Sequence, residues 1–378
     1  MIYLDHNATT PVAPPVVEAM TAAMTDGFGN ASSPHAVGRA ATSRVKAATQ
    51  QVAELLKVTP QRLVWTSGAT ESLNTAIRAV AGHETTFLAA RTEHRAVLDV
   101  LEALQDDGHP ITWLDVEADG ALHPATVSGA LSDTQGVPAL VVAAANNETG
   151  VCNDITALTD VVRAGDGLLV CDATQQVGKL PVDLSGVDFA AASAHKLYGP
   201  QGVGVLVTPA GRRAEPLILG GGHQRGWRSG TLNMPGIVGF GAAAALALDE
   251  LEEQAARQRQ LTTQLETQLA KQLPGIVVNG DRARRLPNTL NVRVPGVPAD
   301  ALIVNCPEVA FSSGSACTSA TPTPSHVLLA MGLGDVHAEE SVRFSVGRGT
   351  RTEDIASAAQ QVVAAARRIH ALVAEEAI

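Results

Sequence analysis

The chemistry of this chain centres on a lysine between two predicted strands. Lys196 follows the apolar run 189–192 and precedes a second predicted strand, 202–207, which is entered through a Gly/Pro turn. A lysine at the end of a buried strand must pair with an anion, lose its proton or be used covalently, because an unpaired buried ammonium group is costly. From this stretch alone, a lysine that extends its amine to solvent explains the pattern equally well.

Polar residues follow other apolar runs, and each has an ordinary structural explanation when taken alone. The small-residue turn 66–72 opens a helix, and the backbone at Ala69 and Thr70 suits a phosphate, although a plain N-cap explains it too. His94 fits a structural histidine, and Asn147 fits an Asx turn. These residues indicate a site only if they meet.

Asp172 is the residue that most strongly indicates a functional site. It ends a fully apolar strand, so its carboxylate needs a cationic partner or several hydrogen-bond donors. Gln175 follows it, and Ser193 and His195 precede Lys196. In open α/β sheets, ligands bind beyond the carboxyl ends of the strands. The set meets the needs of pyridoxal 5′-phosphate, which uses a lysine for its aldehyde, a carboxylate for its ring nitrogen and a helix N-terminus for its phosphate.

Alternating strands and helices must position these residues. Apolar runs separated mostly by helical stretches predict a largely parallel sheet with helices on both faces. A helix rich in Ala, Leu, Glu and Gln over 235–272 leads into a smaller C-terminal domain of strands and helices. The predicted strands of the sheet lie at 62–65, 86–90, 111–114, 138–145, 168–171 and 189–192.

Composition limits the function and the compartment. A chain of 378 residues favours two domains. A net charge of −11 without a long Lys/Arg run argues against binding to nucleic acid or to a membrane surface. The absence of a leader-like start and of any run of about 18 apolar residues predicts a cytoplasmic protein. Four cysteines without CxxC spacing predict neither a disulfide scaffold nor a zinc site.

The chain resembles the class V aminotransferase family, and more closely its cysteine desulfurases, of the NifS/IscS-like group I long-loop type. The resemblance implies a PLP-dependent transferase of fold type I. Its large domain, 13–249, would hold a mostly parallel seven-stranded sheet, and residues 1–12 and 250–378 would form a smaller α+β domain. The motifs that carry the resemblance lie at 3–11, 66–72, 92–94, 146–148, 172–175, 193–200 and 220–231.

The resemblance also implies a role for each cofactor residue. Lys196 would bind the cofactor covalently and, once freed, move the proton of the substrate α-carbon. Asp172 would pair with the pyridine nitrogen, Gln175 with the ring oxygen, and His94 would stack on the ring and act in acid/base steps. The phosphate would be held by Ala69, Thr70, Ser193 and His195, and by Thr231 of a neighbouring subunit, so a homodimer with shared sites is expected.

Arg343 is the predicted ligand of the substrate carboxylate, with Asn147 assisting. A guanidinium group suits a carboxylate because it donates two parallel hydrogen bonds. The alternatives are an exposed strand residue and a surface ion pair.

Cys317 decides among enzymes of this family. It lies among small residues, 312–320, which predict a partly exposed loop, whereas Cys152, Cys171 and Cys306 lie beside apolar residues and are expected to be inert. The resemblance implies that Cys317 takes sulfur from L-cysteine as a persulfide, releases L-alanine and passes the sulfur to an acceptor protein. No resident metal is expected, although Cys317 would also suit a transient iron–sulfur ligand.

Several alternatives stay open. The acceptor could serve iron–sulfur cluster assembly or the thiolation of tRNA or DNA, because the chain ends at Ile378, before the scaffold-docking tail of many relatives. Other readings are a selenocysteine lyase, another class V aminotransferase, or a non-catalytic protein of the same fold. If Cys317 is an exposed thiol without a function, the chain would instead be another class V aminotransferase or a non-catalytic protein of the same fold.

Overall fold

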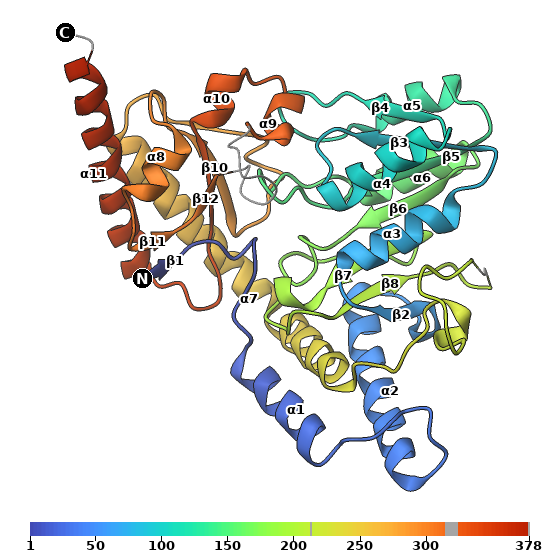
Figure 1. Cartoon of the computed structure of the whole chain (residues 1–378). Helices are drawn as coiled ribbons and strands as arrows, with labels where there is room; N and C mark the ends of the chain where they lie inside the picture. The colour runs from blue at the N-terminus through green and yellow to red at the C-terminus, as the bar shows by residue number, and fades with distance from the viewer. Residues whose placement is uncertain (212–213, 314–323, 377–378) are drawn as a thin grey trace.

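The computed structural model describes residues 1–211, 214–313 and 324–376, and it has the predicted α/β fold with a larger and a smaller domain (Figure 1). The larger domain is built on a seven-stranded sheet in the order β2-β8-β7-β6-β5-β3-β4. Its strands are β2 (Leu63–Thr66), β3 (Thr85–Ala90), β4 (Ile111–Leu114), β5 (Val137–Ala143), β6 (Leu168–Asp172), β7 (Phe189–Ser193) and β8 (Gly204–Val207).

Six of these strands are parallel to one another, and β8 alone in the sheet is antiparallel to its neighbours β2 and β7. Strands β5, β6 and β7 are almost continuously apolar and buried, as expected of parallel strands covered on both faces. The carboxyl ends of β2, β3, β5, β6 and β7 therefore all lie at one edge of the sheet.

Helices cover both faces of this sheet. On one face, α3 (Ala69–Val80) and α4 (Arg95–Asp106) contribute to a core that includes Phe87 and Phe189. On the other, the larger core takes residues from α1 (Pro14–Thr25), α2 (Ala36–Leu56), α5 (Pro124–Asp133), α6 (Ile155–Ala164) and α7 (Met234–Gln272).

The smaller domain has its own sheet, in the order β12-β13-β10-β9, and its own core. Leu290, Val342 and Phe344 of this sheet share this core with residues of helix α11 such as Ile355. A separate parallel pair, β1 with β11, joins the first residues of the chain to this domain. The elements are β1 (Ile2–Tyr3), β9 (Val277–Val278), β10 (Thr289–Arg293), α8 (Ala299–Val304), β11 (Val309–Ala310), β12 (Ser312–Ser313), α9 (His326–Ala330), α10 (Asp335–Glu339), β13 (Ser341–Ser345) and α11 (Thr352–Glu376).

Helix α7 links the two domains and corresponds to the helix predicted over 235–272 (Figure 1). Its first part supplies Ile237 and Phe240 to the core of the larger domain, and its last part supplies Leu261 and Leu265 to the core of the smaller one. By length and composition α7 could cross a membrane, but 44% of its most apolar window is buried within the protein. Packing against both cores accounts for that apolar stretch.

Candidate active site

The predicted site residues His94, Asn147, Asp172 and Lys196 all follow the carboxyl ends of parallel strands. His94 comes shortly after β3, Asn147 after β5, Asp172 ends β6, and Lys196 lies in the short 3-10 turn 194–196 that follows β7. The parallel register of β3, β5, β6 and β7 places these four positions at one edge of the sheet. This is the arrangement that the sequence predicted.

The amine of Lys196 lies against the backbone of the N-terminal segment. Its Nζ donates to the carbonyl oxygens of Asn7 and Ala8, at 2.5 and 2.7 Å. Next to the turn that carries this lysine, Gly178 adopts a left-handed conformation (φ +75°), and a Cβ there would lie 2.9 Å from Cβ of Leu197. The glycine therefore allows the segment after Asp172 to pack closely against the turn that carries Lys196.

Asp172 and His94 face a common region. Oδ1 of the buried Asp172 accepts a hydrogen bond from the backbone N–H of Thr174 at 3.0 Å. Nδ1 of His94 accepts from the N–H of Ala96 at 3.0 Å, so a neutral ring carries its proton on Nε2. Although the residue as a whole is exposed, desolvation lowers the pKa of His94, while Asp172 raises it and Lys196 lowers it. The three groups are therefore close enough to act on one another.

The N-terminus of α3 forms an open donor site at the same edge. Gly68 precedes Ala69 and Thr70 and provides no side-chain cap for the helix. A Cβ on Gly204, at the start of β8, would lie 2.6 Å from the backbone of Gly68, so only a glycine lets this strand approach the turn. Unpaired N–H groups at a helix N-terminus bind anions such as phosphate.

Ser193 and His195 lie on the segment beside Lys196. Ser193 is buried, and Nδ1 of His195 lies 3.1 Å from Oγ1 of Thr9. Burial, Lys196 and Lys179 together lower the pKa of His195 to about 4, so the ring is neutral at physiological pH. It therefore offers one hydrogen-bond donor and one acceptor rather than a positive charge.

Thr231 is the residue predicted to reach the phosphate that a neighbouring subunit binds. It is exposed, and within the described part of the chain it makes no hydrogen bond. Arg228 of the same segment pairs with Glu71, with 3.0 Å between Nε and Oε1, and this fastens the segment beside the first turn of α3. Thr231 is thus left free for a contact outside its own chain.

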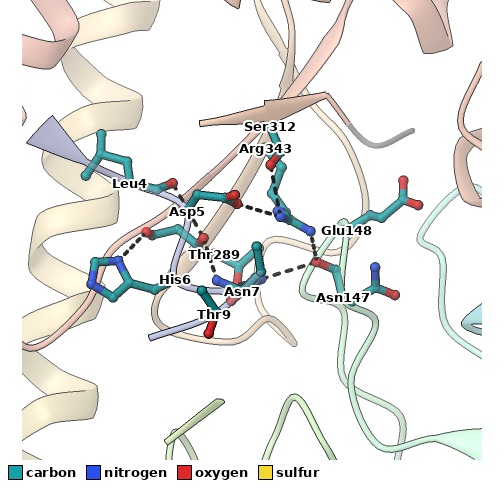
Figure 2. A network of polar contacts seen from close by, with 12 residues as sticks. Leu4, Asp5, His6, Asn7, Thr9, Asn147, Glu148, Thr289, Ser312 and Arg343 are labelled. Carbon is teal, nitrogen blue, oxygen red and sulfur yellow. Dashed lines mark hydrogen bonds and ion pairs between the residues drawn. The ribbon is translucent and has the colours of Figure 1, made fainter. Parts of the chain in front are cut away.

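Arg343 of β13 is buried, so it is neither an exposed strand residue nor part of a surface ion pair. Its Nη2 lies 2.6 Å from Oδ1 of Asp5 and 3.3 Å from Oγ of Ser312, and its Nη1 donates to the carbonyl oxygen of Asn147 at 3.0 Å (Figure 2). Its Nε atom has no hydrogen-bond partner among the described residues. The guanidinium therefore retains a donor that a bound carboxylate can use.

Cys317 lies outside the described residues, but both neighbouring segments are anchored near Arg343. Before the gap, Ser312 and Ser313 pair with β13. After it, Ser325 donates a hydrogen bond to the carboxylate of Glu148, and Nε2 of His326 lies 2.9 Å from the carbonyl oxygen of Glu93.

The other three cysteines are poorly suited to nucleophilic chemistry. Burial raises the pKa of Cys152 to about 11, raises that of Cys306, and raises that of the fully buried Cys171 well above its usual range. The thiolate form, which is the nucleophile, is therefore scarce at all three.

Sequence reasoning missed several buried polar residues around the site. Asn7, Glu93 and Glu148 lie within the quoted motifs, but their side chains were given no role. Burial raises the pKa of Glu93 to about 8 and that of Glu148 to about 7. Lys179 was not considered, although its spacing of four residues from Gln175 was a usable signal. Over the described residues, no group of three or more His, Cys, Asp or Glu side chains could hold a metal ion.

Comparison with known proteins identifies the class to which this fold and site belong. The model of the class V aminotransferases matches residues 2–357, and the chain belongs to this family.

The relatives narrow the assignment. The chain is 44% identical over 377 residues to a cysteine desulfurase IscS of Anaeromyxobacter sp. (strain Fw109-5), covering 97% of this chain and 93% of the relative. A NifS-like protein superposes with a TM-score of 0.88 at 31% identity, covering 96% and 98% of the two chains. A structure described as SspA in complex with cysteine gives 0.80 at 30% identity, covering 92% and 99%. Within its family, the chain therefore lies among the cysteine desulfurases, which depend on pyridoxal phosphate.

The donor set of the site fits pyridoxal phosphate. A buried carboxylate ends β6, a lysine amine lies at the next strand end, and the uncapped N-terminus of α3 offers backbone donors at the same edge. These are the groups that the ring nitrogen, the aldehyde and the phosphate require.

Proposed function

We propose that this chain is a PLP-dependent cysteine desulfurase that converts L-cysteine to L-alanine and takes the sulfur onto Cys317. The observation that carries the proposal is that His94, Asp172 and Lys196 meet at one edge of the sheet. Asp172 and Lys196 lie close enough to His94 for both to act on its pKa. When bound, pyridoxal phosphate supplies an aldehyde and an electron sink. Side chains of the protein bind the substrate, move the protons and accept the sulfur.

Lys196 serves both as the covalent attachment and as the group that moves a proton. Its amine is held by the carbonyl oxygens of Asn7 and Ala8, which keep it at the site when it is free. Asp172 holds the pyridine nitrogen protonated, and Gln175 donates to the ring oxygen. His94, whose pKa is lowered, stacks as a neutral ring that can take up a proton in an acid/base step.

Phosphate binding falls to Ala69 and Thr70 at the N-terminus of α3, and to Ser193 and His195 after β7. The free N–H groups of α3 and the neutral His195 support this role. Thr231, exposed and without a hydrogen bond within the described chain, reaches the phosphate of a second subunit. The enzyme is accordingly a homodimer with shared sites.

The substrate carboxylate binds Arg343, with Asn147 assisting. The unpartnered Nε of this buried guanidinium supports the role, because a charged group without its full set of hydrogen bonds favours an anionic ligand. L-Cysteine as the substrate is consistent with the cysteine complex of the SspA structure.

Cys317 accepts the sulfur. Its thiolate forms an S–S bond to the substrate sulfur as the C–S bond of L-cysteine breaks, the carbon gains a proton, and the products are L-alanine and a persulfide on Cys317. An acceptor protein then receives the outer sulfur, in iron–sulfur cluster assembly or in thiolation of tRNA or DNA. Transient ligation of an iron–sulfur cluster by Cys317 belongs to the same proposal.

The proposal also covers the domain boundaries, the compartment and the absence of nucleic-acid and membrane binding. Residues 13–249 form the PLP-binding domain, and residues 1–12 with 250–378 form the domain that carries the Cys317 segment. The enzyme acts in the cytoplasm and binds neither nucleic acid nor membrane. The net charge of −11 supports the last point.

The test measures L-alanine and sulfide from L-cysteine in the presence of a reductant, for the parent chain and for Cys317→Ser and Lys196→Ala. The parent should release both products at equal rates. Cys317→Ser should keep the visible absorbance of the bound cofactor but lose sulfide release, and Lys196→Ala should lose that absorbance.

Three outcomes would overturn the proposal. Full activity in Cys317→Ser, or transamination by the parent, would leave only a class V aminotransferase of another kind. A preference for selenocysteine with little activity on L-cysteine would assign a selenocysteine lyase instead.

A further inference from the structure

Lys179 is a buried lysine that the proposed function leaves without a role. It is 6% exposed, and no Asp or Glu of the described chain lies within ion-pair distance of it. The charges that act on it include two cations, Lys196 and Arg343, and burial is the main reason why its pKa is well below the usual range. A buried amine beside two cations costs stability, so a local requirement must keep it there.

Lys179 contacts two side-chain amides, and its shorter contact is with Gln175. Its Nζ donates to Oε1 of Gln175 at 2.7 Å and lies 3.4 Å from Oδ1 of Asn7. Both Gln175 and Lys179 lie in the turn segment 174–179, four residues apart, where side chains share a face as they do on a helix. Lys179 thus reaches the site through Gln175.

Two fixed partners determine which way the Gln175 amide points. Its oxygen accepts from Lys179, and its Nε2 donates to the carbonyl oxygen of Asn7 at 3.1 Å. A flipped amide would set its oxygen against the Asn7 carbonyl and its NH₂ against the Lys179 amine. One hydrogen of Nε2 is taken by Asn7, and the second is left for another acceptor.

The same carbonyl oxygen also connects this amide to the reactive lysine. Asn7 O accepts from Nζ of Lys196 at 2.5 Å as well as from Nε2 of Gln175. The two nitrogens are therefore neighbours around one acceptor. An NH₂ group held there lies beside the amine that attaches the cofactor.

We propose that Lys179 is a positioning residue that fixes the Gln175 amide so that the free hydrogen of its NH₂ group is directed at the ring oxygen of pyridoxal phosphate. The inference rests on the proposed contact between Gln175 and that oxygen. Lys179 itself does not touch the cofactor or the substrate. A donor to the ring oxygen stabilises its anionic form, so it lowers the pH at which the bound cofactor loses its proton.

The experiment is a double-mutant cycle with Lys179→Met and Gln175→Leu, read as the midpoint of the visible absorbance of the bound cofactor against pH without substrate. Each single variant should move the midpoint upward by about one pH unit, because each removes the oriented donor. The double variant should move it no further than Gln175→Leu alone. Lys271→Met, which removes an exposed lysine of α7, should leave the midpoint unchanged.

Two results would overturn the inference. Either the midpoint does not move in Lys179→Met, or the effect of Lys179→Met persists in full in the Gln175→Leu background. Thermal unfolding of the cofactor-free proteins checks that the variants fold, and Lys179→Leu repeats the cycle should Lys179→Met not fold. Failure of the proposed function is distinct, because the parent would then show no cofactor absorbance, or Lys196→Ala would retain it.

Discussion

Removing the negative charge of Asp5, which pairs with the buried Arg343, should have opposite effects on stability and on substrate binding. Their side chains are 18% and 8% exposed, and 2.6 Å separates Oδ1 from Nη2 (Figure 2). Asp5 neutralises the cation that the substrate carboxylate is proposed to bind. Asp5→Asn should therefore weaken the fold while improving the binding of L-cysteine.

The magnitudes follow from charge and distance. Asn keeps an acceptor for the guanidinium but loses the charge-assisted part of the bond, so we expect a loss of about 2 kcal/mol in the free energy of unfolding. Two carboxylates that share one guanidinium repel by about 3 kcal/mol at 5 Å and an effective dielectric constant of 20. Because part of this repulsion is screened or relaxed, we expect about a tenfold fall in KM for L-cysteine.

The assay compares urea unfolding and steady-state kinetics of the parent, Asp5→Asn and Asp335→Asn. Asp335, in the exposed first turn of α10, controls for the loss of one negative charge and should change neither quantity. An unchanged or higher KM in Asp5→Asn, together with reduced stability, would refute the reasoning. Arg343 would then be a structural partner of Asp5 rather than a carboxylate ligand.

Three further predictions concern the fold and the edge of the site. Arg62 donates to the carbonyl groups of Thr208 and of residues 184, 185, 187 and 188. Because a lysine ammonium cannot replace the several donors of the guanidinium, Arg62→Lys should lower the free energy of unfolding in urea by about 3 kcal/mol. A loss near zero would contradict this prediction. Glu148 has a pKa of about 7 against an ordinary 4.5, so the folded state holds its proton more tightly and stability falls as pH rises between these values. Glu148→Gln should remove on the order of 3 kcal/mol of that fall, whereas a parent-like pH slope would argue against it. Gly204→Ala places a Cβ 2.6 Å from the Gly68 backbone, so it should cost about 1–3 kcal/mol and weaken cofactor retention, measured by absorbance after dialysis. Gly334→Ala, where a Cβ meets open space, is its control, and equal behaviour of the two would rule out the contact.

Most of the fold could be predicted because its strands are apolar and its helices periodic. The run 189–192 lies within β7, Phe189–Ser193, and the helix expected over 235–272 is α7 with its start shifted by one residue. The antiparallel direction of β8 was not predicted, because a buried strand has the same apolar composition in either direction.

The site was predictable where a residue ends a strand, and less so where it depends on contacts between distant segments. Asp172 and Lys196 follow apolar runs and could be recognised locally. The side-chain roles of Asn7 and Asp5 depend on contacts with residues such as Thr289 and Arg343, which no local pattern predicts. Lys179 is buried by tertiary packing, and a lysine in a turn normally lies in solvent.

The docking of residues 2–7 against the smaller domain also affects the order in which parts of the chain can fold. The backbone N–H of Asn7 donates to Oγ of Ser345, 338 residues later, and β1 pairs with β11. Residues 2–7 therefore cannot reach these partners until residues 309–345 have been synthesised, although the large sheet is complete in sequence by Val207. Because the Asn7 carbonyl accepts a hydrogen bond from Lys196, a chain that stops before Ser345 would lack the contact that fixes Asn7 beside this lysine.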